Sequence, residues 1–378
     1  MSATLRLFLL AGEPSGDRIG ADLVHRLRKR VRVELSGVGG DALSNEGLTS
    51  LFDMAELSVM GWADVLPRLP KLLWRVHQVA RTILRQRPDV AVLVDSQVFS
   101  ALVARYVHRW NPRIPVLLCV APAVWAWKPE RASKLSPHFR EILSVLPFEP
   151  AFMRKAGGPK TSYIGHPAVK AFNLRPDLPA SGPLLLLPGS RDGELRRHLP
   201  LMRAAVEELA RLPGVSGFVL PTPSRLEHHV RSIVSDWPEK VNVVSGNTAM
   251  AEAMGQALAA IAVSGTVTLE LALSGVPMVV TYVAEKKQIE LWLKYKVRFA
   301  SLPNIILNRD LVPEVLQAEP DPAPLLEATR ALLGDHSAMF AQLEGFKQIK
   351  ELMDRGEPDD PRIDAVERVL NYLPDRKK

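Results

Sequence analysis

Short apolar runs alternate with amphipathic segments along almost the whole chain, and this alternation restricts the chain to one class of fold. In the first half, the apolar runs Leu5–Leu10, Val90–Val94 and Val116–Val120 alternate with helix-like segments at 19–30 and 100–110. The second half continues with apolar runs at 184–187, 217–220, 241–244, 259–263 and 277–282, and with helix-like segments at 199–211, 249–256 and 267–274. Such alternation is typical of parallel sheets with crossover helices. We therefore predict an α/β protein with two Rossmann-like, doubly wound parallel sheets.

A proline-rich stretch, NLRPDLPASGP at 173–183, lacks both periodicities and predicts a connector between two domains. The expected N-terminal domain spans 1–172 and the expected C-terminal domain spans 184–339. The tail looks helical, and we expect its part 340–378 to pack back on the first domain. Ligands of doubly wound sheets bind at the carboxyl ends of the strands, so we expect a cleft between the two domains.

Composition excludes several classes of protein. With 378 residues, 47% of them hydrophobic and 24% charged, the chain can bury a large core and is not disordered. The apolar run at the start leads directly into Glu13 and Asp17, so we expect no secretion signal, and no run has the ~18 to 20 apolar residues of a membrane span. The single cysteine, Cys119, excludes an internal disulfide and, within an apolar run, is expected to be a core residue.

The net charge of +7 favours anionic ligands, namely phosphates, nucleotides, nucleic acid or acidic lipid. The basic residues are spread along the chain without an aromatic-interleaved patch or zinc-finger spacing, so we expect no nucleic acid partner. There is no His/Cys cluster with zinc spacing and no Asp-x-Asp pair for a nucleotide-bound metal. We expect a site with no metal and no other cofactor.

Two first-half motifs carry candidate chemistry. LAGEPSGD, residues 10–17, places small residues at a strand-to-helix turn, where a ligand approaches the backbone, but no lysine follows its glycines as a mononucleotide P-loop requires. The nearest match to a dinucleotide fingerprint, in SGVGGDA, is better interpreted as a tight glycine turn. Asp95 ends a strand in AVLVDSQVF, where its carboxylate is either a general base or a helix N-cap.

Two second-half motifs indicate a nucleotide site. In LLLLPGSRDGEL, the turn Gly189–Ser190 offers backbone N–H groups, and Arg191 offers a planar fork suited to phosphate oxygens. In AVSGTVTLELALSG, residues Ser264, Gly265 and Thr266 end a strand and open a helix, whose N-terminus attracts anions. Glu270 lies one helical turn on, where a carboxylate can accept hydrogen bonds from a ribose diol.

The stretch 59–87 combines apolar residues at helical spacing with six Lys/Arg and one acidic residue. A basic amphipathic segment suits an anionic membrane surface, although most amphipathic helices simply pack on a sheet. The residues that we expect to face the membrane are Trp62, Leu66, Leu69, Leu72 and Leu73.

Eleven segments occur in an order that identifies a family resemblance. They are AGEPSGD, VMGWADVL, DSQVF, APAVWAW, LPFE, GHP, LPGSR, SGTVTLE, PMVVTY, SLPN and PEVLQ, and together they span nearly the whole chain. The chain thereby resembles the lipid-A-disaccharide synthase family, an inverting glycosyltransferase family (family 19) of the GT-B architecture. The resemblance implies transfer of a 2,3-diacylglucosamine unit from UDP to the 6-hydroxyl of 2,3-diacylglucosamine 1-phosphate, which leaves a β(1→6) linkage and releases UDP.

The resemblance also implies residue roles. Asp95 matches the family's proposed base, and Glu13, Ser15 and Gly16 match a turn that faces the reacting sugars. Gly189, Ser190, Arg191 and the 264–266 helix end would stabilise the departing diphosphate, and Glu270 would hold the ribose. Asn304, Glu314 and Gln317 match positions around the nucleotide or sugar. The partners implied are UDP-diacylglucosamine, diacylglucosamine 1-phosphate and an anionic membrane surface, for a cytoplasmic protein bound peripherally to the inner face of the cytoplasmic membrane.

The chain departs from the family pattern near Asp95. The family typically has Asp-x-Pro-Asp-Phe where this chain has Asp95-Ser-Gln97-Val98-Phe99, and serines where it has Ala121 and Ala123. Three alternatives stay open: transfer to another glycolipid, another GT-B-like UDP-sugar enzyme such as a 2-epimerase, and a non-catalytic nucleotide-sugar or lipid-binding relative. The sequence leaves a homo-oligomer as an open alternative to a monomer.

Overall fold

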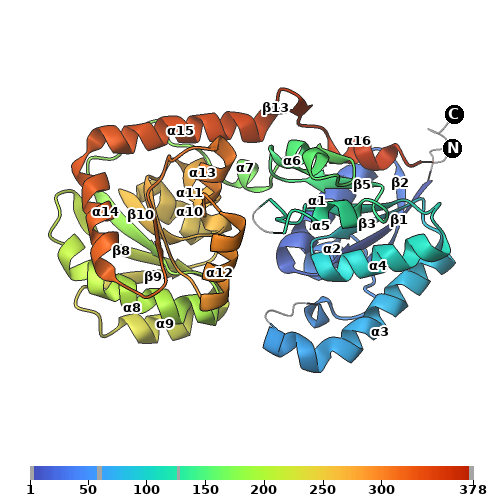
Figure 1. Ribbon diagram of the computed structural model, residues 1–378, viewed down its shortest axis with the longest axis horizontal. Coiled ribbons are helices and arrows are strands. Elements are labelled where there is room, and N and C mark those ends of the chain that lie inside the picture. The colour runs from blue at the N-terminus through green and yellow to red at the C-terminus, as the bar shows by residue number, and fades with distance from the viewer. Residues whose placement is uncertain (1–3, 58–61, 126–127, 374–378) are drawn as a thin grey trace. The chain divides into compact units, whose positions relative to one another are not determined.

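The computed structural model describes residues 4–57, 62–125 and 128–373, without the side chains of 62–67, 247, 286 and 287 (Figure 1). The chain forms two compact units. Unit 1 comprises Met1–His166 and Arg355–Lys378, and unit 2 comprises Pro167–Asp354. The chain therefore passes between the units twice, after His166 and after Asp354.

Unit 1 is built on a six-stranded parallel sheet with the strand order β2-β1-β3-β4-β5-β6. Its strands are β1 (Thr4–Ala11), β2 (Arg32–Val38), β3 (Val90–Val94), β4 (Val116–Cys119), β5 (Glu141–Ser144) and β6 (Thr161–Tyr163), followed near the end of the chain by the hairpin β13 (Gly356–Glu357) and β14 (Asp360–Pro361). Its helices are α1 (Pro14–Arg28), α2 (Asp41–Asn45), α3 (Trp62–Gln86), α4 (Gln97–Trp110), α5 (Arg131–Leu135), α6 (Glu149–Lys155) and α16 (Ala365–Leu370), with a short 3₁₀ turn at Met54–Glu56.

Both faces of this sheet are covered, because alternate residues of each strand point to opposite sides. On one face, Phe8 and Leu10 pack with Val79 and Ile83 of α3 and with α4. On the other face, the intervening strand residues pack against α1 and α16. Val90–Val94 is buried at every position, which is why this run forms a central strand and not an edge strand.

Unit 2 repeats the architecture with the strand order β12-β11-β10-β7-β8-β9, again with parallel strands. The strands are β7 (Gly182–Leu187), β8 (Val215–Thr222), β9 (Val241–Ser245), β10 (Ala259–Val263), β11 (Met278–Val283) and β12 (Glu314–Gln317). The helices are α7 (Ala168–Ala171), α8 (Asp192–Leu209), α9 (Glu227–Val234), α10 (Asn247–Gln256), α11 (Thr266–Ser274), α12 (Lys286–Tyr295), α13 (Leu302–Leu307), α14 (Pro322–Gly334) and α15 (His336–Arg355), with a 3₁₀ turn, η2, at Ser224–Leu226.

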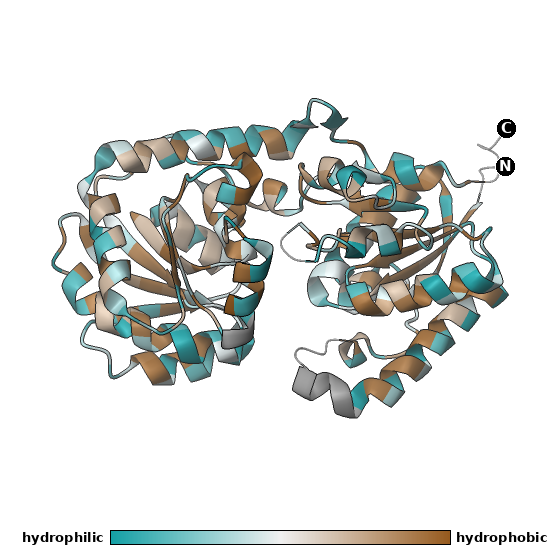
Figure 2. Ribbon diagram, in the orientation of Figure 1, coloured by the Kyte–Doolittle hydropathy of each residue, from teal (hydrophilic) through white to brown (hydrophobic). Residues whose placement is uncertain are grey.

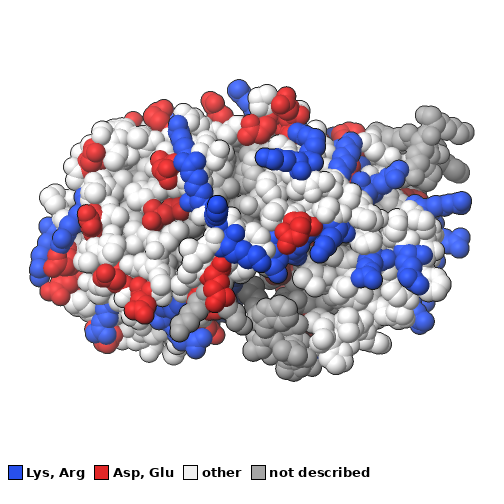
Figure 3. Space-filling view, in the orientation of Figure 1, with Lys and Arg blue, Asp and Glu red and all other residues white. Residues whose placement is uncertain are grey.

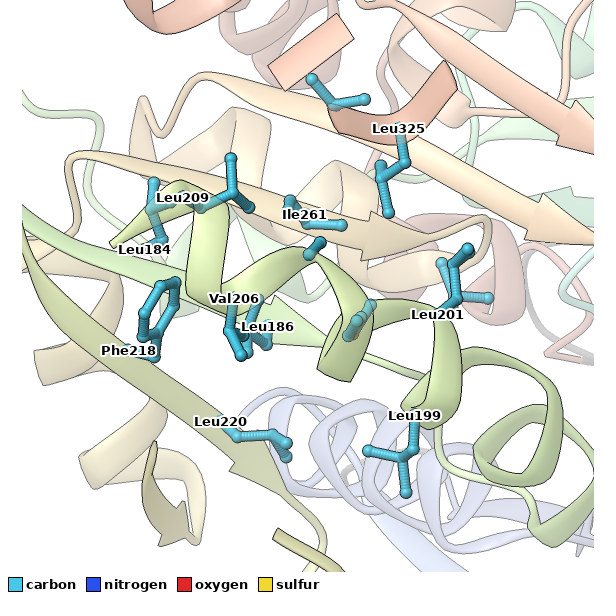
Figure 4. Close-up of a cluster of buried hydrophobic side chains, with 14 of the residues drawn as sticks. Leu184, Leu186, Leu199, Leu201, Val206, Leu209, Phe218, Leu220, Ile261 and Leu325 are labelled. Carbon is cyan, nitrogen blue, oxygen red and sulfur yellow. The ribbon is translucent and has the colours of Figure 1, made fainter. Parts of the chain in front are cut away.

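The core of unit 2 joins its central strands to α8 and α14. Leu184 and Leu186 of β7 and Ile261 of β10 pack against Val206 of α8 and Leu325 of α14 (Figure 4). In both units the strands form the hydrophobic centre (Figure 2). The predicted α/β class with two doubly wound parallel sheets is confirmed.

The predicted connector, 173–183, does not behave as a linker. It belongs to unit 2, where the Arg175 guanidinium donates to the backbone carbonyl oxygens of Gly275 (2.8 Å) and Ala257 (2.5 Å). The proline-rich composition could not predict these hydrogen bonds, because the carbonyl partners of Arg175 lie about 80 to 100 residues further along the chain. The division between the units comes earlier, after His166.

The tail divides between the units. Most of α15 belongs to unit 2, where the Gln342 side chain bonds the backbone of Met278 through both of its polar atoms (2.8 and 3.1 Å). From Arg355 onward the chain belongs to unit 1, and Arg368 of α16 forms a bidentate pair with buried Glu141 of β5 (2.9 and 2.6 Å). The expected packing of 340–378 on the first domain therefore applies to the part after α15 only.

Candidate functional site

In unit 1, the strand order reverses between β1 and β3, since β2 lies on one side of β1 and the later strands lie on the other. Crevices at such reversals are where doubly wound sheets bind ligands. The two loops that leave this point contain Gly12–Glu13 and Asp95–Ser96. They touch, because a Cβ added at Gly12 would lie 1.7 Å from the Ser96 hydroxyl oxygen. The structure therefore brings together the two first-half motifs.

Asp95 occupies a strained backbone position. Asp95 (φ 56°) and Ser96 (φ 43°) are consecutive non-glycine residues in the left-handed region, which costs of order 1–3 kcal/mol per residue. Two hydrogen bonds hold this turn: the Asp95 N–H donates to Cys119 O (2.9 Å), and the Ser100 hydroxyl donates to Asp95 O (2.8 Å). Partial burial raises the pKa of the Asp95 carboxyl, which makes the carboxylate a stronger base.

The LAGEPSGD motif divides into exposed and structural residues. Glu13 is the half-buried, extended N-cap of α1, and Ser15 is exposed. Gly16 is buried, with its Cα facing Val94 of β3, where a Cβ would lie 3.3 Å from a methyl carbon. The Asp17 carboxylate accepts from the backbone N–H groups of Gly40 and Ala42, both at 2.8 Å. Asp17 thus fills the SGVGGDA turn, which supports the interpretation of that stretch as a structural glycine turn.

The residues that depart from the family pattern have different surroundings. Val98 is 68% exposed on the first turn of α4, and Gln97 beside it is half-buried. Ala121 is buried and Ala123 is half-buried. Cys119 is buried in β4, and burial raises the pKa of its thiol to about 12. The prediction that Cys119 is a core residue is confirmed.

A buried carboxyl that the sequence did not single out lies at the start of α6, after β5. Glu149 is 3% exposed and accepts from the Trp125 indole N–H (3.2 Å) and the Leu146 N–H (3.1 Å). Burial raises the pKa of Glu149 to about 8. Glu149 thereby ties the loop after β5 to the APAVWAW loop after β4.

In unit 2 the strand order reverses between β7 and β10, and the loops there contain the other two predicted motifs. Gly189 has φ 106°, and a Cβ there would lie 2.4 Å from a Glu194 carboxylate oxygen. That carboxylate accepts from the backbone N–H groups of Ser190 (2.9 Å) and Arg191 (3.3 Å), and from the Arg191 guanidinium (3.0 Å). The turn therefore binds an anion already, in the form of its own glutamate at the start of α8.

The loop after β10 is more open. Gly265 and Thr266 are exposed, and a Cβ at Gly265 would meet nothing within 4 Å. The Ser264 hydroxyl donates to Ala300 O (2.6 Å), and Glu270 is half-buried one turn along α11. The predicted phosphate turn and helix end thus lie at neighbouring strand ends, because β7 and β10 pair directly.

Asn304 and Glu314 come together, but their polar atoms are used within the chain. Asn304 is 1% exposed; its amide donates to Val312 O (2.9 Å) and Glu314 (2.8 Å), and its oxygen accepts from the Leu311 and Val312 N–H groups. Glu314 also accepts from the backbone N–H groups of Ala300 (2.8 Å) and Ser301 (2.9 Å). In this arrangement both residues position the 300–314 loop.

Gln317 is also held locally, since its amide donates to Asp321 O (2.7 Å) at the start of α14. The sequence did not identify two residues near the carboxyl ends of the unit 2 strands, Glu194 and Arg225. Glu194 had a usable signal, because it stands at the capping-box spacing from Arg191. Arg225, whose guanidinium donates to Ser190 O (2.7 Å), follows a Pro-Thr-Pro-Ser turn that shows no chemical pattern.

The predicted membrane-facing residues of α3 divide into three groups. Leu69 (43%) and Leu73 (50%) are exposed, whereas Leu72 packs partly against the core. The side chains of Trp62 and Leu66 lie outside the described residues. Trp74, which was not predicted, is 56% exposed beside them. Arg75 is paired with Glu56 (2.7 Å) and lies over the Phe52 ring (4.2 Å), so it does not belong to an open cationic face.

Among the described parts of the chain, no helix is both long and apolar enough to cross a membrane. Over the same residues, no group of three or more His, Cys, Asp or Glu side chains is arranged to hold a metal ion. Acidic and basic side chains are interspersed on the face shown in Figure 3.

Solved structures with a similar fold include nucleotide-sugar enzymes. The S. aureus protein MnaA, solved with UDP, matches with a TM-score of 0.63 and 12% identity, covering 98% of this chain and 96% of its own. The UDP-GlcNAc 2-epimerase from Neisseria meningitidis has a TM-score of 0.59 at 12% identity (93% and 98% covered), and the spinosyn rhamnosyltransferase SpnG has a TM-score of 0.58 at 14% identity (97% and 100% covered). At these identities the likeness shows the fold alone.

Sequence relatives are much more similar. The lipid-A-disaccharide synthase of Rhodopseudomonas palustris is 41% identical over 97% of this chain and 96% of its own length, and that of Bradyrhizobium diazoefficiens is 39% identical with the same coverage. The family model described as lipid-A-disaccharide synthetase matches residues 7–361. The chain thus belongs to the lipid-A-disaccharide synthase family of glycosyltransferases.

Proposed function

We propose that this protein transfers a 2,3-diacylglucosamine unit from UDP to the 6-hydroxyl of 2,3-diacylglucosamine 1-phosphate. The acceptor oxygen attacks the anomeric carbon from the face opposite UDP, and the bond between that carbon and the diphosphate breaks. The acceptor hydroxyl loses its proton to Asp95, and UDP leaves with the electron pair of the broken bond. The products are the β(1→6) disaccharide 1-phosphate and UDP.

The observation that carries the proposal is the setting of Asp95. A carboxylate held at the strand-order reversal of a doubly wound sheet, with its pKa raised by burial, suits a general base for a hydroxyl. The strained backbone at Asp95 and Ser96 supports the same role, because such strain concentrates at functional sites. Val98 stands where the family pattern has its second aspartate, so of the two carboxylates in that pattern this chain lacks only the second. The strained turn and the hydrogen bond from the Ser100 hydroxyl to the Asp95 carbonyl oxygen keep Asp95 in place.

Unit 2 supports the donor side of the reaction. Charge builds on the diphosphate as the bond breaks, and preorganised donors stabilise that charge most when they need not move. The N–H groups of Ser190 and Arg191 already converge on one carboxylate, which indicates that they can hold a phosphate oxygen. We propose that the donor diphosphate takes the place of Glu194 at this turn, and that Glu270 holds the ribose.

We further propose that the protein binds peripherally to the cytoplasmic membrane. Both proposed substrates carry acyl chains, and exposed Leu69, Leu73 and Trp74 on α3 form an apolar patch beside basic residues. Exposed Arg81 and Arg85 supply the basic part of this surface, whereas Lys71, which is 59% exposed, pairs with Glu56 (3.3 Å). Trp74 suits the lipid interface, because its ring is apolar and its N–H is polar.

Product identification tests the reaction. Purified protein is given UDP-2,3-diacylglucosamine with 2,3-diacylglucosamine 1-phosphate, and the products are identified by mass spectrometry. We expect one disaccharide 1-phosphate for each UDP released. UDP-2,3-diacylglucosamine that is epimerised, or a product formed only with a different acceptor, would contradict the proposed reaction.

A further inference from the structure

From the geometry at the end of β8, we infer that Arg225 is a second guanidinium that binds the donor diphosphate, alongside Arg191. This inference rests on the proposed function and adds a residue to its donor site. The ligand class is a nucleoside diphosphate attached to a sugar.

The position of Arg225 follows from the sheet. β8 pairs directly with β7, and both strands run in the same direction, so their carboxyl ends lie at one edge. Arg225 lies in η2, just after β8 ends at Thr222, and its guanidinium reaches the Ser190 carbonyl oxygen at 2.7 Å. Arg225 is therefore fixed on the same turn whose N–H groups hold the Glu194 carboxylate.

No carboxylate in the part of the chain that the structure describes matches the charge of Arg225. Glu194 pairs with Arg191, and Glu227, close to Arg225 in the chain, is bonded to Arg231 and Ser245. Within the described residues Arg225 forms no ion pair, and a guanidinium with one N–H on a carbonyl keeps four more to donate. Arg191 and Arg225 would then each supply a planar fork at the turn that contains Ser190, which suits the two phosphates of a diphosphate.

The Thr222 hydroxyl is another polar group at the same strand end. Thr222, the last residue of β8, is 6% exposed, and its hydroxyl has no hydrogen-bond partner among the described residues. Buried hydroxyls are nearly always satisfied by protein, water or a ligand. This end of β8 thus combines an unmatched cation with an unsatisfied hydroxyl, beside an amide turn that accepts anions.

The test compares R225Q with the parent protein and with R211Q. Arg211 is a matched control, because it is an exposed arginine of unit 2 whose ion pair, among the described residues, is with Glu207, one turn before it (3.0 Å). The dissociation constant for UDP, kcat and the KM of each substrate are measured for all three proteins. We expect R225Q to weaken UDP binding about tenfold, or about 1.4 kcal/mol, to lower kcat, and to leave the acceptor KM unchanged. R211Q should match the parent.

R225K separates a diphosphate contact from a purely structural bond. Lysine keeps the charge but not the planar fork, so it cannot hold Ser190 O and two phosphate oxygens together. We expect UDP affinity between those of R225Q and the parent, with a thermal midpoint close to the parent's. UDP affinity and kcat of R225Q equal to the parent's would overturn this inference alone. A parent protein that neither binds nor releases UDP would overturn the proposed function as well.

Discussion

At the scale of single residues, the site that we propose combines groups that we expect to face ligand with groups that hold the first set in place. We propose that Asp95 belongs to the first kind, since its carboxyl lies at a strained turn that is held through the Asp95 backbone N–H and carbonyl groups. Asn304 belongs to the second kind, because all of its amide hydrogen-bonding capacity is directed to Leu311, Val312 and Glu314. The sequence placed both residues near the site but could not separate these roles.

Replacement of Asn304 tests its positioning role. N304A leaves two backbone N–H groups, a carbonyl and a carboxylate without their partner, and each unsatisfied buried group costs about 1–3 kcal/mol. We expect a loss of a few kcal/mol in the free energy of unfolding, measured by urea denaturation. T266A, at an exposed position, serves as the control and should unfold like the parent. A stable N304A protein with only a raised donor KM would instead indicate direct ligand contact.

Asp95 and Arg191 could be predicted because the chemistry of a residue at a strand end is visible in the local sequence. Arg175, Glu149 and Arg225 could not, because each acts through partners distant in the chain: Arg175 bonds carbonyls near 257 and 275, Glu149 bonds Trp125, and Arg225 bonds Ser190. Local periodicity carries no information on such contacts.

At the scale of elements, the strands were the best-predicted part of the fold. Ala259–Val263 has the predicted bounds, because a buried parallel strand is apolar on both faces and ends at the first polar residue. The helices begin earlier than predicted; α8 begins at Asp192, whereas periodicity placed it at 199. Its first turn is capped by Glu194 and lies at the site, so polar residues there hid the helical pattern.

A histidine joins two elements of unit 2. His198 of α8 is fully buried; one ring nitrogen accepts from the Val283 N–H of β11 (2.9 Å), and the other lies 2.8 Å from Glu194 O. The first contact requires a neutral ring, with the proton on Nδ1 facing that carbonyl. Burial lowers the pKa of His198 below its usual value.

The stability of unit 2 should therefore depend on pH. The unfolded chain binds a proton at His198 near pH 6.5, whereas the folded chain binds it only at lower pH, so stability is lost as pH falls below about 6.5. We expect the urea midpoint of the parent to fall between pH 7.5 and 5.5. H198Q should be less stable at pH 7.5 and show a smaller change over this range. H229Q, at an exposed position, is the control and should retain the parent's full change in urea midpoint. If H198Q also retains the full change, a group other than His198 is responsible.

The exposed end of α3 makes a prediction about membrane binding. The double variant L73S/W74S removes two exposed apolar side chains without touching Val76, Val79 or Ile83, which pack into the core. We expect the apparent affinity for anionic liposomes, measured by flotation, to fall about tenfold, since burial of each such side chain contributes about 1.5–3 kcal/mol at most. L293S, at a 75% exposed leucine of unit 2, is the control. Equal flotation of L73S/W74S and the parent would contradict membrane contact through α3.

At the scale of the whole molecule, the two units share a plan. In each, the predicted motifs follow the two strands at which the strand order reverses: β1 and β3 in unit 1, and β7 and β10 in unit 2. This correspondence explains why motifs about 80 residues apart in each half lie at neighbouring strand ends. The boundary between the units was misplaced because a proline-rich composition resembles a linker even where an arginine fastens it to a domain.

The central claim is that Asp95 of unit 1 takes the proton of the acceptor hydroxyl, and that unit 2 binds the UDP that leaves. The most direct measurement compares D95N with the parent in turnover and in UDP binding. The variant keeps the size and the hydrogen-bonding backbone of Asp95 but cannot accept the proton. We predict that kcat falls about 10²- to 10⁴-fold. The dissociation constant for UDP should stay within about twofold of the parent's, which is well below the tenfold change that about 1.4 kcal/mol of binding free energy would produce. Turnover by D95N at the parent's rate, with the same disaccharide product, would contradict the claim.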